Sequence, residues 1–233
     1  MITFFIPCLN EEGNVGRTID TILEAMRGRK ESCQIIVVDD ASADGSVAEV
    51  EGRIRRYPEM GIELIRNRSC QGIGRNYFLA AQHAGGDHFM LVNGDAVETA
   101  DSIRRILSCL GKADAVVPYY GRNLSRPLFR QLLSRTFIFL VNRLSGNRLR
   151  YYNGPVLHKT ENVRKWAPKA SGFGYQAELL CRLLDEGISV VEVEISYHER
   201  KQGASKAFRF KNCLSVGNTL LRIGLRRLKK GIS

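Results

Sequence analysis

Oxygen-bearing side chains end a short apolar run near the middle of the chain. Residues 89–92 are all apolar, and Asn93, Gly94 and Asp95 follow them at once. Such a run is typical of a strand buried on both faces. Amide and carboxylate oxygens on either side of a glycine suit a hard cation or a ribose. An Asn-Gly turn that begins a helix explains the same residues, so this stretch alone leaves both interpretations open.

Two further polar clusters follow apolar runs in the same way. Asn10 and Glu11 come after residues 2–6, and Asp39 and Asp40 come after residues 35–38. Because the carboxyl ends of parallel strands lie along one edge of a sheet, we expect the three clusters to meet there. Carboxylates at this edge would accept hydrogen bonds from a nucleotide base and ribose, and would hold a cation against a pyrophosphate.

The elements that would position these clusters alternate between strand and helix. Strands are predicted at 2–6, 35–38, 62–65, 89–92 and 115–117, with helices at 11–27, 46–57, 73–84 and 99–110. Pro7 is expected to close the first strand, Asn10 to cap the first helix and Asp44 to cap the second. The alternation predicts an α/β fold of Rossmann type, with a mostly parallel central sheet and helices on both faces.

The regular alternation of strands and helices ends after Pro118. Residues 128–144 are apolar but are interrupted by three arginines, which favours a helix or helix pair in a membrane interface; a core helix remains the alternative. Residues 174–185 predict a helix and 188–195 a strand. Residues 208–230 predict a basic amphipathic helix that binds a membrane surface, or else packs with a solvated face. No stretch has 18 apolar residues, so no transmembrane helix is expected.

Charge is distributed unevenly along the 233 residues, whose net charge is +11. Residues 1–119 carry 13 Lys and Arg against 17 Asp and Glu, whereas 120–169 carry 11 against 1 and 199–233 carry 10 against 1. This pattern favours an anionic partner that meets part of the surface. The six cysteines are scattered without a Cys-x-x-Cys pair, which disfavours a zinc or redox motif and fits a reducing compartment. The amino terminus has no basic n-region, so no signal peptide is expected.

Several motifs resemble one enzyme family. Residues 6–11 (Ile-Pro-Cys-Leu-Asn-Glu), 38–46 (Val-Asp-Asp-Ala-Ser-Ala-Asp-Gly-Ser) and 93–95 resemble the sugar-donor motifs of family 2 glycosyltransferases with the GT-A fold. Residues 172–178 and 200–206 resemble the polyprenyl-phosphate branch, which includes dolichyl-phosphate mannose and glucose synthases. The resemblance implies a GT-A domain at 1–210, with an acceptor or membrane-interface segment at about 120–150, followed by a basic amphipathic helix at 211–233.

The resemblance also implies roles for individual residues. The nucleotide-sugar pocket would comprise Pro7, Leu9, Glu11, Asp39, Asp40, Asn93 and Asp95. Asn93 and Asp95 would bind a divalent cation, Mg²⁺ or Mn²⁺. The acceptor side would comprise Arg122, Arg126, Gln176, Glu178, Arg200, Ser205 and Lys206. Asp95, Arg200 and Lys206 are the expected catalytic residues, because they would neutralise the leaving diphosphate and hold the acceptor phosphate.

Two positions depart from the pattern of this branch. Where the branch usually has Asp-x-Asp followed two residues later by Gln, this chain has Asn93, Asp95 and Val97. Only one strong anionic ligand remains, so weaker metal affinity is expected. Glu98 could reach the same site, although the expected helix geometry points its side chain elsewhere. Leu9 replaces a common tyrosine, which alters how the base would be held.

The expected function is transfer of a hexose, with inversion, from a nucleotide sugar of the GDP-mannose or UDP-glucose type to a polyprenyl or dolichyl phosphate. A lipid phosphate is already largely ionised at neutral pH, so no general base is needed. The expected location is peripheral, on the cytoplasmic face of an anionic membrane. Two alternatives stay open: a family 2 glycosyltransferase that acts on a different acceptor, and a degenerate non-catalytic nucleotide-sugar-binding subunit. A membrane partner subunit is a further expected partner. Nucleic acid is not expected as a partner, because the basic segments lack interleaved aromatic residues.

Overall fold

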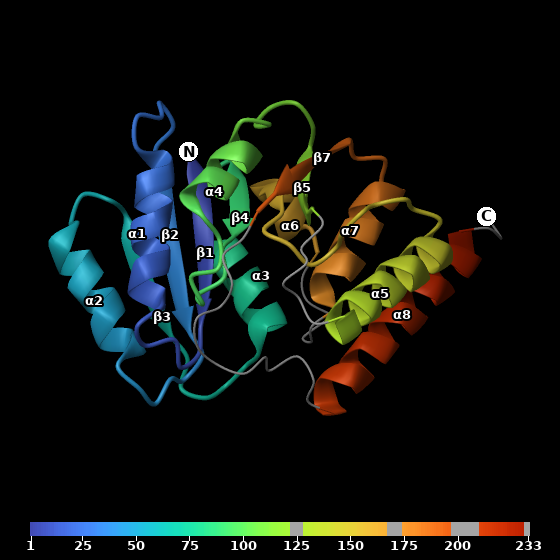
Figure 1. Cartoon of the computed structure of the whole chain (residues 1–233), viewed down its shortest axis with the longest axis horizontal. Coiled ribbons are helices and arrows are strands. Elements are labelled where there is room, and N and C mark those ends of the chain that lie inside the picture. Colours follow the sequence, from blue (N-terminus) through green and yellow to red (C-terminus); the bar gives the residue numbers. More distant parts are fainter. Residues whose placement is uncertain (122–127, 167–173, 197–209, 231–233) are drawn as a thin grey trace.

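A seven-stranded sheet with the strand order β3-β2-β1-β4-β6-β5-β7 forms the centre of the chain (Figure 1). The computed structural model describes residues 1–121, 128–166, 174–196 and 210–230. The strands are β1 Ile2–Cys8, β2 Cys33–Asp39, β3 Ile62–Arg66, β4 His88–Leu91, β5 Ala115–Tyr120, β6 Leu157–Lys159 and β7 Val190–Ile195. The helices are α1 Val15–Met26, α2 Ser46–Arg56, α3 Ile73–His83, α4 Ala100–Leu107, α5 Leu128–Ser145, α6 Thr160–Arg164, α7 Tyr175–Asp185 and α8 Phe210–Lys230.

The predicted mostly parallel sheet is confirmed, with one strand that the sequence did not predict. β1 lies between β2 and β4 and is parallel to both, so that Phe5 is opposite Ile36 on one side and Leu91 on the other. β7 continues the sheet parallel to β5. The short strand β6 lies between β4 and β5 and runs antiparallel to both. The chain therefore reverses direction inside the sheet, at the junction between its two halves.

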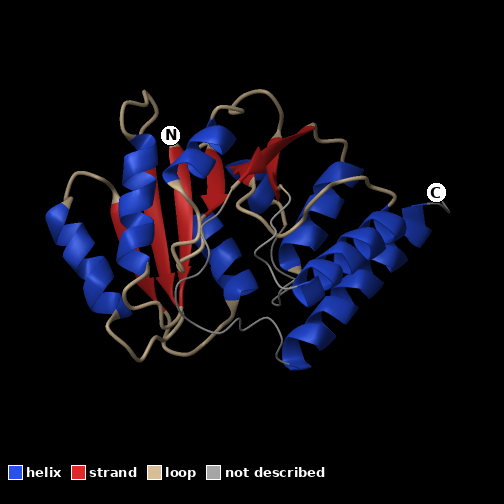
Figure 2. Ribbon diagram, viewed as in Figure 1, coloured by secondary structure: helices blue, strands red, loops and turns tan. Residues whose placement is uncertain are grey.

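Helices cover both faces of the sheet (Figure 2). Because successive strand residues point to opposite faces, Phe4 and Ile6 join a core with α1, α2 and α4. Phe5 faces the other way, where α3, α6 and α7 pack. There the ring of Tyr77 lies 5.9 Å from that of Phe5 and 4.9 Å from that of Tyr175. This aromatic cluster joins α3 and α7 to the central strand.

Helices α5 and α8 pack against each other although they are far apart in the sequence, and α8 also packs against α7. The pair lies at the end of the molecule opposite α2 (Figure 1). Val141 and Ser145 of α5 and Thr219 and Ile223 of α8 are buried, so each helix has one face in the core. Residues 128–145 form a single helix. None of the helices within the described residues is long and apolar enough to cross a membrane.

The start of the first helix differs from the prediction. α1 begins at Val15, four residues later than expected, and Asn10 does not cap it. Instead Asn10 has a left-handed backbone with φ of 52°, and its Oδ1 accepts a hydrogen bond from Ala43 N at 2.8 Å. Pro7 does not close β1, which continues to Cys8. The cap residue of α2 is Gly45 and not the expected Asp44. Asp44 lies one residue earlier, where its Oδ1 accepts a hydrogen bond from Ser46 N at 3.0 Å.

Candidate functional site

The loops that follow β1 and β4 meet at Gly94. A Cβ atom on Gly94 would lie 2.5 Å from the carbonyl oxygen of Pro7 and 3.6 Å from Cγ of Glu11. Only glycine allows this close approach of the two backbones. Thr18 of α1 fixes the same loop, because its hydroxyl donates to Asn93 O and accepts from Ala96 N, both at 3.2 Å. Glycine is therefore needed here for the contact between two strand ends.

The loops that follow β1 and β2 are joined by reciprocal hydrogen bonds. Asn10 N donates to Ser42 Oγ at 2.9 Å, and Glu11 N donates to Ser46 Oγ at 2.8 Å. In return, Gly45 N donates to a carboxylate oxygen of Glu12 at 3.0 Å. The three predicted polar clusters thus lie at one edge of the sheet, as the parallel topology requires.

Backbone strain gathers at this edge. Within the described residues, the non-glycine residues with positive φ are Asn10 at 52°, Ala41 at 66° and Ala96 at 55°. Each lies in the loop that follows β1, β2 or β4. Left-handed backbone costs on the order of 1–2 kcal/mol for a residue with a Cβ, and such strain is typical of ligand sites. The residues with strained backbone and the polar clusters therefore lie at the same edge of the sheet.

The two acidic residues at the end of β2 differ in their surroundings. Asp39 is buried and accepts weak hydrogen bonds from Ser42 N at 3.3 Å. Asp40 accepts from Asn67 Nδ2, Cys70 Sγ, Gln71 N and Gly72 N at 2.7–3.0 Å. Burial opposes its ionisation, but these hydrogen bonds outweigh burial and lower its pKa to about 2. Asp40 therefore ties the loop before α3 to β2, and its contact with a sugar donor stays a prediction.

Glu98 belongs to the site, contrary to the expectation that it points away. α4 begins at Ala100 with Thr99 as its cap, so Glu98 lies before the helix. Its side chain is buried, and its Oε1 accepts a hydrogen bond from Asn93 Nδ2 at 2.6 Å. Burial, and then the charge of Asp95, raise the pKa of Glu98 to about 8. The spacing of Asn93 and Glu98 was the only sequence signal for this contact.

The fit of the site to a divalent cation rests on the oxygen atoms that it offers. Asn93 and Asp95 are both half-buried and lie on either side of Gly94, whose backbone is held against β1. An amide oxygen and a carboxylate suit Mg²⁺ or Mn²⁺. The described residues contain no group of three or more His, Cys, Asp or Glu that could hold a metal alone. A cation here would need a further partner, such as the phosphates of a bound nucleotide.

The predicted acceptor residues that the structure describes lie in the second half of the chain. Gln176 is buried on α7 and donates to Gly154 O at 3.0 Å. Glu178 is buried two residues later, where it forms ion pairs with Arg182 at 2.8 Å and with Arg222 of α8 at 3.6 Å. Both side chains thus have protein partners, and their acceptor role stays a prediction. The predicted residues Arg122, Arg126, Arg200, Ser205 and Lys206 lie outside the described residues.

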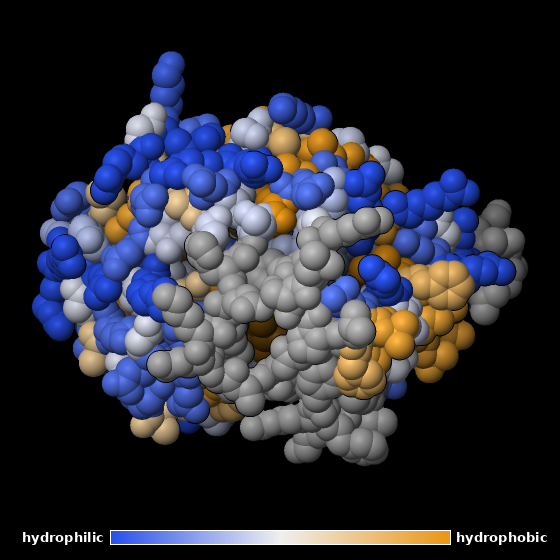
Figure 3. Space-filling view, viewed as in Figure 1, coloured by the Kyte–Doolittle hydropathy of each residue, from blue (hydrophilic) through white to orange (hydrophobic). Residues whose placement is uncertain are grey.

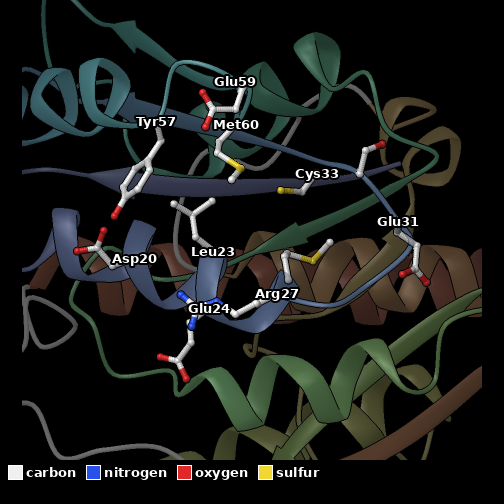
Figure 4. Close-up of a pocket in the computed structure, with 11 residues that line it drawn as sticks. Asp20, Leu23, Glu24, Arg27, Glu31, Cys33, Tyr57, Glu59 and Met60 are labelled. Atoms are coloured by element: carbon white, nitrogen blue, oxygen red, sulfur yellow. The ribbon is translucent and has the colours of Figure 1, made fainter.

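A surface cavity of about 580 Å³ lies at the other edge of the sheet (Figure 4). It is lined by Asp20, Leu23, Glu24, Met26, Arg27, Glu31, Ser32, Cys33, Tyr57, Glu59 and Met60. Cys33 is the first residue of β2 and Asp39 the last. At about 3.3 Å per residue, the cavity is roughly 20 Å from the polar edge. It is therefore separate from the cluster of Glu11, Asp39 and Asn93.

The fold is that of the GT-A glycosyltransferases. Solved structures support the fold: glucosyl-3-phosphoglycerate synthase from Mycobacterium tuberculosis superimposes with a TM-score of 0.71 at 19% identity, over 96% of this chain and 79% of that one. The family model described as glycosyl transferase family 2 matches residues 3–165. The chain belongs to glycosyl transferase family 2.

Curated relatives match over most of the chain. An undecaprenyl-phosphate mannosyltransferase of Micrococcus luteus is 24% identical over 86% of this chain and 85% of its own length. A polyprenol monophosphomannose synthase of Mycolicibacterium smegmatis is 26% identical over 86% and 78%. An undecaprenyl-phosphate 4-deoxy-4-formamido-L-arabinose transferase of Pectobacterium carotovorum is 26% identical over 88% of this chain, which spans only 62% of that relative. The resemblance to the polyprenyl-phosphate branch is thereby confirmed.

Proposed function

We propose that this domain transfers a hexose from a nucleotide sugar to a polyprenyl phosphate with inversion at the anomeric carbon. The observation that carries the proposal is the convergence of Glu11, Asp39 and Asn93 with Asp95 at one sheet edge, on loops held by mutual hydrogen bonds. Relatives named as transferases to undecaprenyl phosphate support this acceptor class. We expect the sugar donor of this reaction to be of the GDP-mannose or UDP-glucose type.

The reaction requires two things of the protein: alignment of the two substrates and positive charge near the leaving diphosphate. An oxygen of the lipid phosphate forms a bond to the anomeric carbon, while the bond from that carbon to the nucleoside diphosphate breaks and the diphosphate leaves with the electron pair. The lipid phosphate is already ionised, so no proton has to be removed. Asn93 and Asp95 would hold a divalent cation, which supplies positive charge for the diphosphate. Crystal structures of glucosyl-3-phosphoglycerate synthase contain Mn²⁺ with UDP-glucose, which supports this use of the family site.

The surface formed by α5 and α8 supports a peripheral location on an anionic membrane. Its exposed apolar side chains are Phe129, Leu132, Leu133, Phe139 and Leu140 on α5, and Leu221 and Leu225 on α8. The residues on α5 recur at helical spacing and form one stripe. Arg135, Arg143, Arg222 and Arg227 are also exposed on these helices. The apolar patch over α5 and α8 is visible at the lower right of Figure 3, and we call it the α5–α8 surface.

Turnover is the direct test of the proposed reaction. The chain is incubated with Mn²⁺, undecaprenyl phosphate and a panel of nucleotide sugars, and release of nucleoside diphosphate is measured. We expect release that depends on the polyprenyl phosphate. Release with 3-phosphoglycerate instead would favour a different acceptor. Tight binding of a nucleotide sugar without release from any acceptor would favour the non-catalytic binder.

Vesicle flotation tests the location. We expect the chain to float with vesicles that contain anionic phosphatidylglycerol and to bind neutral phosphatidylcholine vesicles much more weakly, because basic residues near an anionic surface contribute about 1 kcal/mol each. Equal binding to both kinds of vesicle would contradict the electrostatic part of the proposal. No binding to either would favour a protein partner subunit on the same surface.

A further inference from the structure

Asn93 and Glu98 form a pair in which one residue orients the other. A carboxamide has a donor side, Nδ2, and an acceptor side, Oδ1. Nδ2 of Asn93 donates to Oε1 of Glu98 at 2.6 Å. The planar amide then turns its Oδ1 away from Glu98. Because Glu98 is only 4% exposed, its carboxyl group is held by the surrounding core and has little freedom to release the amide.

We propose that Glu98 is a positioning residue, which fixes the Asn93 carboxamide so that its oxygen faces the bound cation and diphosphate. The proposal rests on the proposed function, because it assumes that Asn93 lies beside the sugar donor. It assigns Glu98 a task that neither the family match nor the named relatives assign. It also gives a reason for asparagine at position 93, where the resembling branch has an acid.

The reason is electrostatic. An aspartate at position 93 would place a second carboxyl oxygen about 2.6 Å from that of the buried Glu98. Two carboxylates so close in a site with little water cannot both be ionised. An aspartate at position 93 would therefore have to share one proton with Glu98, whereas the amide of Asn93 donates to Oε1 of Glu98 without one.

A double-mutant cycle tests this pairing without any ligand. Asn93→Asp should lower the Tm by about 5 °C, because two carboxyl groups must then share one proton in a buried site. Glu98→Gln should have a small effect, since a glutamine oxygen still accepts from Asn93. The double variant N93D/E98Q should recover most of the loss, because Nε2 of the new amide donates to the new carboxylate. Additive changes would overturn the pairing.

Cation binding tests the positioning role. Mn²⁺ affinity is measured by titration in the presence of UDP and, separately, GDP. Glu98→Ala should weaken Mn²⁺ binding about tenfold and raise the KM for the nucleotide sugar more than it lowers kcat, whereas Glu98→Gln should retain wild-type values. N93D/E98Q should bind Mn²⁺ about tenfold more tightly than the wild type, since an oriented carboxylate replaces an oriented amide.

The outcomes separate this inference from the proposed function. Asp101→Asn, at an exposed acid on α4 that pairs with Arg104, is the matched control and should change none of these values. Equal losses in Glu98→Ala and Glu98→Gln would overturn the positioning role. Failure of the wild type to bind UDP or GDP would count against the proposed function, while the stability cycle would still decide whether the two residues form a complementary pair.

Discussion

The two halves of the chain use charge in different ways. In the first half, acidic side chains accept hydrogen bonds from backbone groups of neighbouring loops: Glu12 accepts from Gly45, Asp44 from Ser46 and Asp40 from Gln71. In the second half, charge is mostly basic, and several arginines of α5 and α8 are exposed beside exposed leucines and phenylalanines.

The difference shows what each half is suited to bind. Loops that are fixed by one another present a few groups in defined positions, which suits a small ligand that must be aligned. A pair of helices with an apolar stripe and scattered arginines presents area and charge with little geometric demand, which suits a membrane surface. If this comparison is right, substitutions in the two halves will separate sugar-donor binding from membrane binding.

The largest expected effect is that of Asp95→Ala. Asp95 is the carboxylate of the proposed cation site, so its loss should reduce kcat/KM on the order of 10³-fold and abolish Mn²⁺-dependent binding of the nucleotide sugar. Vesicle flotation should be unchanged. Asp87→Ala is the matched control: Asp87 precedes β4 as Asp95 follows it, and its side chain forms an exposed ion pair with the amino terminus. Undiminished Mn²⁺-dependent binding in Asp95→Ala would refute the assignment of the site.

The second-largest expected effect is that of Asp40→Asn, which acts on the loop before α3. Asp40→Asn replaces a carboxylate that accepts from Gln71 N and Gly72 N by an amide, and should lower the free energy of unfolding at pH 7 by about 2 kcal/mol. The folded pKa of about 2 lies below the ordinary 3.8. The contribution of Asp40 is therefore complete above pH 4 and is lost as the pH falls toward 2. Urea unfolding at pH 7 and pH 3 should show the difference between variant and wild type shrinking, whereas a constant difference would contradict the role of its charge.

The sequence predicted the polar edge well because topology determines it. The runs at 2–6, 35–38 and 89–92 are apolar throughout since their strands are covered on both faces, and polar residues begin where that cover ends. Three parallel strands then bring Glu11, Asp39 and Asn93 to one edge without further information. The same reasoning could not predict β6. This strand has three residues and is a strand only because it pairs with β4 and β5 on either side.

Contacts between loops could not be predicted from the sequence. Asn10 has the side chain of a helix cap, but the left-handed backbone and the bonds to Ser42 and Ala43 override that propensity. The direction of the Glu98 side chain was wrong because α4 begins at Ala100, one residue later than predicted, so that Glu98 precedes the cap residue Thr99. The hydrogen bonds from the loop at 67–72 to Asp40 could not be predicted, because only the fold brings that loop close to the end of β2.

A smaller effect is expected on the α5–α8 surface. Leu221→Glu and Leu225→Glu each remove an exposed apolar side chain, 61% and 49% exposed, and add a negative charge. Each should weaken binding to anionic vesicles about tenfold, from roughly 1.4 kcal/mol of lost burial and added repulsion. Turnover with a short-chain, water-soluble polyprenyl phosphate should be unchanged. Met60→Glu, at an exposed apolar residue of the first half, is the control and should float as the wild type does.

The smallest effect concerns the strained alanines. Ala41 and Ala96 have φ of 66° and 55°, which glycine adopts without the steric cost of a Cβ. Ala41→Gly and Ala96→Gly should each raise the free energy of unfolding by about 0.5 kcal/mol, because relief of strain slightly exceeds the entropy that glycine adds to the unfolded chain. Ala48→Gly, at an exposed position in α2, should lower it by about 1 kcal/mol. Equal losses in all three variants would show that the left-handed backbone at the polar edge carries no strain, and would remove that distinction between the two halves.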